Sequence, residues 1–256
     1  MAGRFYYDNG NQQANVVSKL KLAIDSRNGL SVVIGDIGVG KTTLARKLLA
    51  ELDEDRYEAA LLVITNSLVS SEWLLRKIAI QLGISQPELD KSALLGQIHH
   101  RLQEIHEQGK TAVILMDEVQ MLKSAEIMED FRRLLNMNSS GQNILNLVLF
   151  GLSALEDVLS LDEPLGRRIA TNIRVAAFSE QDTRDYILHR LSVAGATVGL
   201  FTEKALAVIY KFSNGIPRLI NTICDNALLE GFLFKSSSVD EKMITAVAID
   251  LGLSVS

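Results

Sequence analysis

Two alternating patterns of hydrophobic positions run along the first two thirds of the chain. Short apolar runs rich in β-branched residues are typical of strands buried on both faces of a parallel sheet. Between them, apolar residues recur every three or four positions, which predicts amphipathic helices. The expected strands are 31–34, 60–64, 112–116, 145–150 and a shorter one at 173–176. The expected helices lie at about 13–26, 41–52, 71–82, 91–108, 125–137 and 153–160. Such alternation predicts βαβ units and an α/β fold.

The pattern changes after Phe178. Ser179 followed by Asp182 is typical of a helix N-cap with an acidic residue at the third helical position. Helical periodicity then covers about 180–194, 203–213, 217–234 and 240–251, with no strand pattern among them. We therefore expect an α/β domain over residues 1–178 and a small all-helical domain over residues 179–256.

Composition places the chain among ordinary globular proteins. Of its 256 residues, 47% are hydrophobic and 22% charged, which is enough to bury a core without a disulfide. Its one cysteine, Cys224, lies in an apolar helical stretch, so we expect a packed structural thiol. No apolar run of about 18 residues and no leader-like N-terminus occurs, which predicts a cytoplasmic chain without direct membrane insertion. The net charge of -5 disfavours a generally basic surface but leaves room for a local basic stripe.

A glycine-rich loop follows the first expected strand. The segment Gly35-x-x-x-x-Gly40-Lys41-Thr42 lies between a buried-strand pattern and a helix pattern, which is the context that a phosphate-binding P-loop requires. Glycines bring backbone N–H groups within reach of phosphate oxygens, and the helix N-terminus adds its dipole. The expected nucleotide contacts are Gly35, Asp36, Ile37, Gly38, Val39, Gly40, Lys41, Thr42 and Thr43. Chance glycine-rich turns are the alternative, and the strand–loop–helix context disfavours them.

Each polar residue in this region has an expected role. Lys41 supplies charge to the β- and γ-phosphates of ATP, and the Thr42 hydroxyl is placed to ligate Mg²⁺. Asp117 and Glu118 follow the strand at 112–116, whose C-terminal end lines the ligand crevice of a parallel sheet. We expect Asp117 to hold Mg²⁺ and Glu118 to polarise the attacking water. The alternative is an N-cap aspartate with a solvated glutamate.

Together with Gly215-Ile216-Pro217-Arg218 in the helical part, these motifs resemble the AAA+ ATPases. Over residues 12–250 the sequence looks most like the ATPase domain of general secretion pathway protein A, of the ExeA and MSHA-pilus type. Transposition ATPases of the TnsC, TniB and MuB kind are similar in the same core. The matching stretches include Gly40–Leu44, Asp117-Glu118-x-Gln120, Arg168-Ile169, Arg190-Leu191-x-x-Ala194-Gly195, Leu200-Phe201-Thr202 and Gly215–Asn221. The resemblance implies a three-layer P-loop NTPase with a five-stranded parallel sheet and a helical lid.

The resemblance also implies further site residues. Sensor 1, a polar residue at the end of the fourth strand, corresponds to Ser153 or the earlier Asn146, and an N-cap is the alternative role for Ser153. The secretion family usually shows Gly-Gln-Pro here, which this sequence lacks. Arg168, next to Arg167, corresponds to an arginine finger that a neighbouring subunit donates, with a surface ion pair as the alternative. Arg218, after a proline at a helix start, corresponds to sensor 2.

Hydrolysis of Mg-ATP at a subunit interface, coupled to a homo-oligomeric ring or filament, is the function that the resemblance implies. One hypothesis is work with a secretion or pilus assembly partner. The other is assembly on double-stranded DNA that recruits a transposase. Basic residues at Lys123, Arg132 and Arg133 are candidates for phosphate contacts, or form an ordinary solvated helix face.

Two aromatic features have open roles. Trp73 lies among apolar residues at helical spacing, which predicts core packing. The segment Phe5-Tyr6-Tyr7 fits packing near adenine, contact with a neighbouring subunit, a docking strap or a disordered end.

Overall fold

The computed structural model describes Tyr7 and residues 12–139, 141–196 and 199–254. Contacts divide these residues into two units. The α/β unit holds residues 15–35 and 41–175. The helical unit holds everything described from Ala176 onward, together with Tyr7, residues 12–14 and the loop 36–40. The helical unit thus includes a loop and an N-terminal segment that the sequence patterns grouped with the α/β part.

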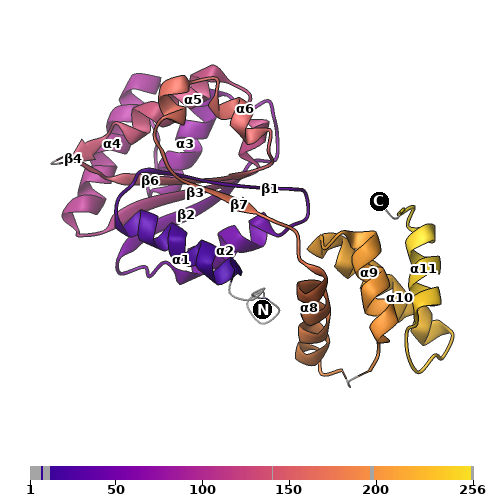
Figure 1. Cartoon of the computed structure of the whole chain (residues 1–256). Coiled ribbons are helices and arrows are strands. Elements are labelled where there is room, and N and C mark those ends of the chain that lie inside the picture. Colours follow the sequence, from indigo (N-terminus) through magenta and orange to yellow (C-terminus); the bar gives the residue numbers. More distant parts are fainter. Residues whose placement is uncertain (1–6, 8–11, 140, 197–198, 255–256) are drawn as a thin grey trace. The chain divides into compact units, whose positions relative to one another are not determined.

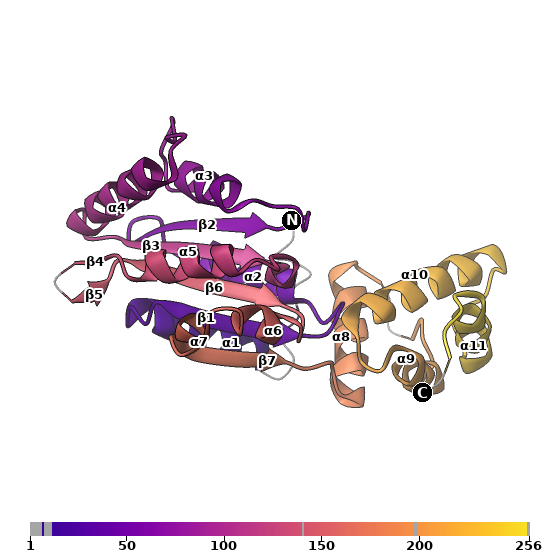
Figure 2. The same ribbon diagram turned by 90° about the horizontal axis from the view of Figure 1, so that it is seen from above.

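Five parallel strands form the sheet of the α/β unit, in the order β2-β3-β6-β1-β7 (Figure 2). They are β1 (Leu30–Gly35), β2 (Tyr57–Val63), β3 (Thr111–Asp117), β6 (Leu145–Gly151) and β7 (Ile169–Val175). The predicted five-stranded P-loop sheet is confirmed. β7 begins four residues before its predicted start at 173, since an edge strand alternates between half-buried and exposed positions and shows no continuous apolar run.

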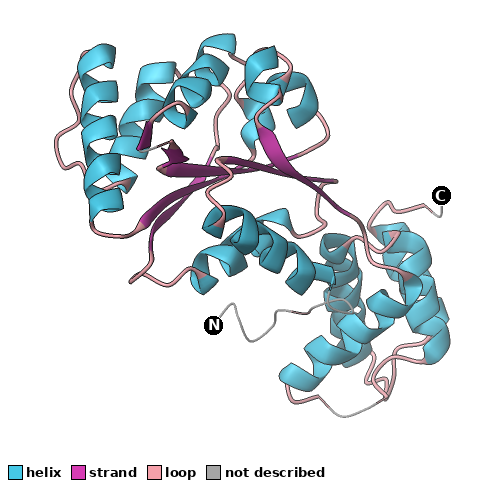
Figure 3. Cartoon of the chain, turned by 60° about the vertical axis from the view of Figure 1, so that its left-hand side comes forward, coloured by secondary structure: helices cyan, strands magenta, loops and turns pink. Residues whose placement is uncertain are grey.

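Helices cover both faces of this sheet (Figures 1 and 3). They are α1 (Gln12–Asp25), α2 (Lys41–Glu51), α3 (Ser71–Gln81), α4 (Lys91–Glu107), α5 (Ala125–Leu135), α6 (Leu155–Leu159) and α7 (Glu163–Gly166). Within β1, Val32 and Ile34 face a core shared with α3, α4 and α5. The intervening Val33 faces a second core shared with α1 and α2. This alternation of side chains across a strand produces the three layers.

Four short elements of the α/β unit leave no pattern in the sequence: the strands β4 (Asn138–Ser139) and β5 (Gln142–Asn143), the helix α7, and the 3₁₀ turn η2 (Val119–Met121). Each is too short to show a period.

Trp73 corrects one expectation. It stays 45% exposed with the Lys77 ammonium 5.3 Å from its ring centre, while Leu74 and Ile78 of the same helix are fully buried. The apolar stripe of α3 is therefore narrower than the spacing predicts.

The helical unit has a core of its own. Its helices are α8 (Glu180–Val193), α9 (Glu203–Ser213), α10 (Pro217–Leu233) and α11 (Glu241–Asp250). The predicted N-cap at Ser179 is confirmed as a full capping box with Asp182. Phe201 and Val239 form an isolated bridge, and no strand occurs among the described residues of this unit. In the part of the chain that the structure describes, no helix has both the length and the apolar character needed to cross a membrane.

Candidate nucleotide-binding site

The glycine-rich loop connects the end of β1 at Gly35 to the start of α2 at Lys41. Lys41 is the first residue of α2, only 6% exposed, and its Nζ donates a 2.8 Å hydrogen bond to the carbonyl of Gly35. Gly38 and Gly40 have φ values of +83° and +102°, which side-chain-bearing residues rarely adopt. The lysine head group therefore lies beside the carbonyl at the end of β1.

Thr42 and Asp117 meet at the carboxyl edge of the sheet. The Thr42 hydroxyl donates to the Asp117 carboxylate at 2.5 Å, and Asp117 is fully buried at the end of β3. The other Asp117 oxygen accepts the backbone N–H of Glu118 at 3.0 Å. A hydroxyl and a carboxylate oxygen are ligand types that Mg²⁺ takes beside substrate phosphates, so these residues fit that ion.

Glu118 has an unusual backbone. Its φ of 62° and ψ of 33° lie in the left-handed region, which is costly for a residue with a side chain. Such conformations persist where the surrounding structure fixes them, and they cluster at functional sites. The Glu118 carboxylate accepts a 2.6 Å hydrogen bond from Gln120, a residue to which the sequence patterns gave no role.

The two sensor 1 candidates lie far apart. Asn146 pairs in register with Val113, near the start of β6, and its Oδ1 accepts from the backbone of Gly29 at 3.1 Å. It therefore lies at the opposite end of the strand from the carboxyl edge that holds Thr42 and Asp117, which removes it as a sensor 1 candidate. Ser153 follows β6 at the correct edge and is exposed, with no side-chain hydrogen bond among the described residues. It is not an N-cap either, because α6 is preceded by Ala154 without a side-chain cap.

Arg168 lies at the start of β7. Its guanidinium donates to the Leu135 carbonyl at 3.3 Å and to the Asn136 side chain, at the C-terminal end of α5. β7 runs parallel to β1. Arg168, which precedes β7, therefore lies at the N-terminal end of the strands, whereas Gly35 lies at their C-terminal end. The neighbouring Arg167 forms an exposed ion pair with Glu163.

A tight turn fixes the backbone of Arg218 in the helical unit. Gly215 has a φ of +71°, and a Cβ at this position would lie 1.9 Å from the Phe178 carbonyl oxygen. Phe178 donates its N–H to the Gly215 carbonyl at 2.8 Å. Pro217 then starts α10, and the N–H of the exposed Arg218 donates to the Gly38 carbonyl at 3.3 Å. Within this unit, Arg218 thus contacts the tip of the phosphate loop.

Tyr7 belongs to an aromatic cluster of the helical unit. Its ring lies 5.9 Å from Phe178, 5.7 Å from Tyr186 and 5.6 Å from His189, measured between ring centres. Phe5 and Tyr6, the other members of the expected aromatic segment, lie outside the described residues. Tyr7 therefore docks on the helical unit.

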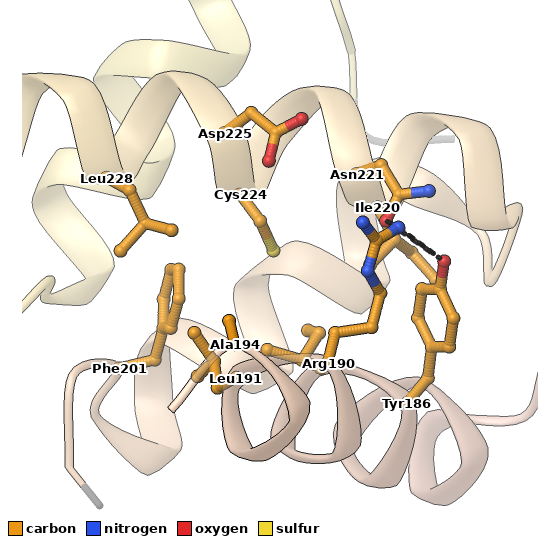
Figure 4. Close-up of a pocket in the computed structure, with 11 residues that line it drawn as sticks. Tyr186, Arg190, Leu191, Ala194, Phe201, Ile220, Asn221, Cys224, Asp225 and Leu228 are labelled. Carbon is orange, nitrogen blue, oxygen red and sulfur yellow. Dashed lines mark hydrogen bonds between the residues drawn. The ribbon is translucent and has the colours of Figure 1, made fainter. Parts of the chain in front are cut away.

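A cavity of about 270 Å³ opens between α8 and α10 (Figure 4). At one end Arg190 donates to the Asn221 side chain at 2.8 Å and to the Tyr186 hydroxyl at 3.1 Å. Apolar side chains such as Phe201 and Leu228 line the rest. Several residues of the secretion-family resemblance lie here, so part of that resemblance reflects the interior of the helical unit rather than phosphate chemistry.

Two of the three residues that are candidates for DNA contacts form ion pairs within the chain. The Arg132 Nε donates to Asp162 at 3.0 Å, and Arg133 pairs with Glu129 at 2.8 Å. Lys123 is exposed. Two of the three cations are thus partly neutralised by neighbouring carboxylates.

The fold and this site define a P-loop ATPase, and residues 24–159 match the AAA domain family. The chain belongs to that family. General secretion pathway protein A of Aeromonas hydrophila is 32% identical over 246 residues, which are 94% of this chain and 44% of that protein. The chain is therefore an AAA+ ATPase that resembles general secretion pathway protein A, and it spans less than half the length of this relative.

Solved structures show the same fold. The ORC2 protein of Aeropyrum pernix, in its ADPNP-ADP complexes, has a TM-score of 0.71 at 16% identity, over 94% of this chain and 67% of that chain. Cdc6p from Pyrobaculum aerophilum has a TM-score of 0.70 at 20% identity, over 93% of this chain and 68% of that chain. At such low identities the likeness concerns the fold alone.

Proposed function

We propose that this chain binds and hydrolyses Mg-ATP at the carboxyl edge of its sheet and couples the reaction to self-assembly. The observation that supports this most directly is the contact between the Thr42 hydroxyl and the buried Asp117 carboxylate. It brings a P-loop hydroxyl and a carboxylate together beside the buried Lys41. A carboxylate buried at the end of β3 is costly on its own, and a Mg²⁺ ion held there would offset that cost.

In this proposal each side chain has one role. Lys41 exchanges its bond to the Gly35 carbonyl for phosphate oxygens. Thr42 and Asp117 would hold Mg²⁺, which would neutralise negative charge on the phosphate oxygens. Glu118 accepts a proton from the water that attacks the γ-phosphate. Arg218, whose backbone N–H donates to the Gly38 carbonyl of the loop, contacts the nucleotide.

Arg168 completes the site of a second copy. Because it lies at the start of β7, about 20 Å along the strands from the edge that holds Gly35 and Asp117, it does not reach the nucleotide of its own chain. A neighbouring subunit is then the acceptor of this arginine, and hydrolysis depends on association. The similarity to general secretion pathway protein A supports a role with a secretion or pilus assembly partner.

Variants of the loop and of the paired acids test the chemistry. We expect Lys41→Ala to abolish ATP binding, because it removes the cation that faces the phosphates. Glu118→Gln should bind ATP normally and accumulate as an assembled, ATP-bound species, because only the proton acceptor is lost. Equal ATP affinity of wild type and Lys41→Ala in a fluorescent-nucleotide titration would refute the proposed site.

Mixing two inactive variants tests the shared site. Lys41→Ala lacks a working nucleotide site but keeps Arg168, whereas Arg168→Ala keeps the site but lacks the arginine. An equimolar mixture should regain ATPase activity that neither variant shows alone, and Arg167→Ala should remain active as the matched control. No recovery on mixing contradicts the shared site. ATPase activity that requires duplex DNA, in a salt-sensitive manner, contradicts the secretion-type role.

A further inference from the structure

Gln120 is a buried polar residue directly behind the catalytic edge. It is 8% exposed and lies in the 3₁₀ turn η2, two residues after Glu118. A buried amide is costly unless both ends are hydrogen-bonded. Gln120 satisfies this condition with two partners, one following β3 and the other following β6, which distinguishes it from an ordinary core residue.

The two hydrogen bonds have a fixed direction. The Gln120 Oε1 accepts the backbone N–H of Leu152 at 3.1 Å. A backbone N–H only donates, so the carbonyl end of the amide must face Leu152. The Nε2 end then faces Glu118 and donates to its Oε2 at 2.6 Å. The amide therefore presents a donor to the carboxylate and holds it by a charge-assisted bond.

Gly151 provides the space for this bridge. A Cβ at Gly151 would lie 2.8 Å from the Gln120 Oε1 and 2.9 Å from a Leu155 methyl carbon. Any larger residue at the end of β6 would thus push the amide away from Leu152. The absence of a side chain at Gly151 therefore leaves the space that the Gln120 amide occupies.

We propose that Gln120 is the positioning residue of Glu118. It links the Glu118 carboxylate to the backbone at the end of β6 and so keeps Glu118 in its left-handed conformation. The other carboxylate oxygen of Glu118, Oε1, has no hydrogen-bond partner among the described residues and is left for the attacking water. This rests on the proposed role of Glu118 as proton acceptor. The contact between the loop after β3 and the end of β6 is thus made by the Gln120 amide.

Substitutions that keep the size of the residue separate positioning from packing. Gln120→Met has a similar length and no hydrogen bonds. Gln120→Glu keeps an acceptor for Leu152 but presents a carboxylate to Glu118. We expect both to lower kcat about 10- to 100-fold, the range for loss of one hydrogen bond to a charged group. The Kd for ATP should stay within about twofold, because Lys41, Thr42 and Asp117 are untouched. Gln181→Met, on the exposed face of α8, is the matched control.

Two further measurements address the mechanism. In a Glu118→Gln background, Gln120→Met should cause no further loss in single-turnover hydrolysis, because a residue that acts through Glu118 has nothing left to position. In the nucleotide-free protein, amide hydrogen exchange at Leu152 should be faster in Gln120→Met than in wild type and Gln120→Glu. Thermal unfolding of each variant serves as the test that it is folded.

The possible outcomes separate the role of Gln120 from the proposed ATP site. An unchanged or raised kcat, an equal loss in both backgrounds, or unchanged exchange at Leu152 overturns the role of Gln120. A wild type no faster than Lys41→Ala overturns the proposed site itself, and the role of Gln120 with it. Normal wild-type hydrolysis with fully active Gln120 variants overturns the role of Gln120 alone.

Discussion

Replacing Gly215 with alanine tests how the helical unit fixes the start of α10. In the structure Gly215 has a φ of +71°, and an added Cβ would lie 1.9 Å from the carbonyl oxygen of Phe178 and 2.8 Å from its carbonyl carbon. Ordinary contacts between a carbon and a carbonyl oxygen are above about 3.3 Å. The two backbone segments must therefore separate by more than about 1 Å.

Three costs follow from this separation. The left-handed conformation costs alanine about 1–2 kcal/mol. The 2.8 Å hydrogen bond from the Phe178 N–H to the Gly215 carbonyl is lost, which costs about 1 kcal/mol. Displacing the buried Phe178 from the core of the helical unit adds about 1–2 kcal/mol. The total is about 3–5 kcal/mol, which corresponds to a fall in Tm on the order of 10 °C.

Gly252 provides the matched control. Its φ is +72°, and an added Cβ would meet no atom within 4 Å. Gly252→Ala therefore carries the backbone cost alone, about 1–2 kcal/mol, and should lower Tm by roughly 4 °C. Scanning calorimetry of the two variants and wild type gives the comparison. If Gly215→Ala unfolds no lower than Gly252→Ala, the close approach to Phe178 does not limit this position and the reasoning is wrong.

Other changes test the remaining charged and titrating groups. Lys91→Met should lower the free energy of unfolding by about 2–4 kcal/mol in urea titrations, because it removes the ammonium 2.8 Å from the buried Asp130 carboxylate; a loss below about 0.5 kcal/mol would contradict this. Burial, assisted by a hydrogen bond with Asp25, raises the pKa of Tyr57 from 10.0 to about 12. Because the folded value exceeds the unfolded one, the stability that this tyrosine contributes is complete below pH 10.0 and is lost as the pH rises through about 12. Ultraviolet titration should show a lower Tyr57 midpoint in Asp25→Asn, and an unchanged midpoint would remove that hydrogen bond as a cause. Burial also raises the pKa of Cys224 to about 12, so at neutral pH its thiol, which lines the cavity between α8 and α10, should react with alkylating reagents more slowly than free cysteine; labelling as fast as that of free cysteine would contradict this.

Local rules in the sequence predicted most of the α/β unit. The strand at 31–34, the glycine-rich loop and the helix from Lys41 follow from hydrophobic period, glycine dihedral freedom and helix-terminus chemistry, all of which act within a few residues. The capping box at Ser179 is equally local. Edge strand β7 was predicted too short because half of its side chains face solvent and the pattern weakens there.

Contacts between distant segments escaped the sequence patterns. Trp73 lies on the predicted helix, but its exposure depends on which elements cover α3. Asn146 and Ser153 are seven residues apart on one strand and its turn, and only the sheet register shows that Asn146 lies at the end away from Thr42 and Asp117.

The amino-acid sequence by itself thus determined the class of fold, the phosphate loop and the paired acids, because each depends on neighbours along the chain. The tertiary structure decided what surrounds those acids. It placed Thr42 against Asp117, and it connected Glu118 through Gln120 to the backbone of Leu152, which lies 32 positions beyond Gln120. A hydrogen bond between segments so far apart depends on strand order and register, and neither periodicity nor a local motif encodes these.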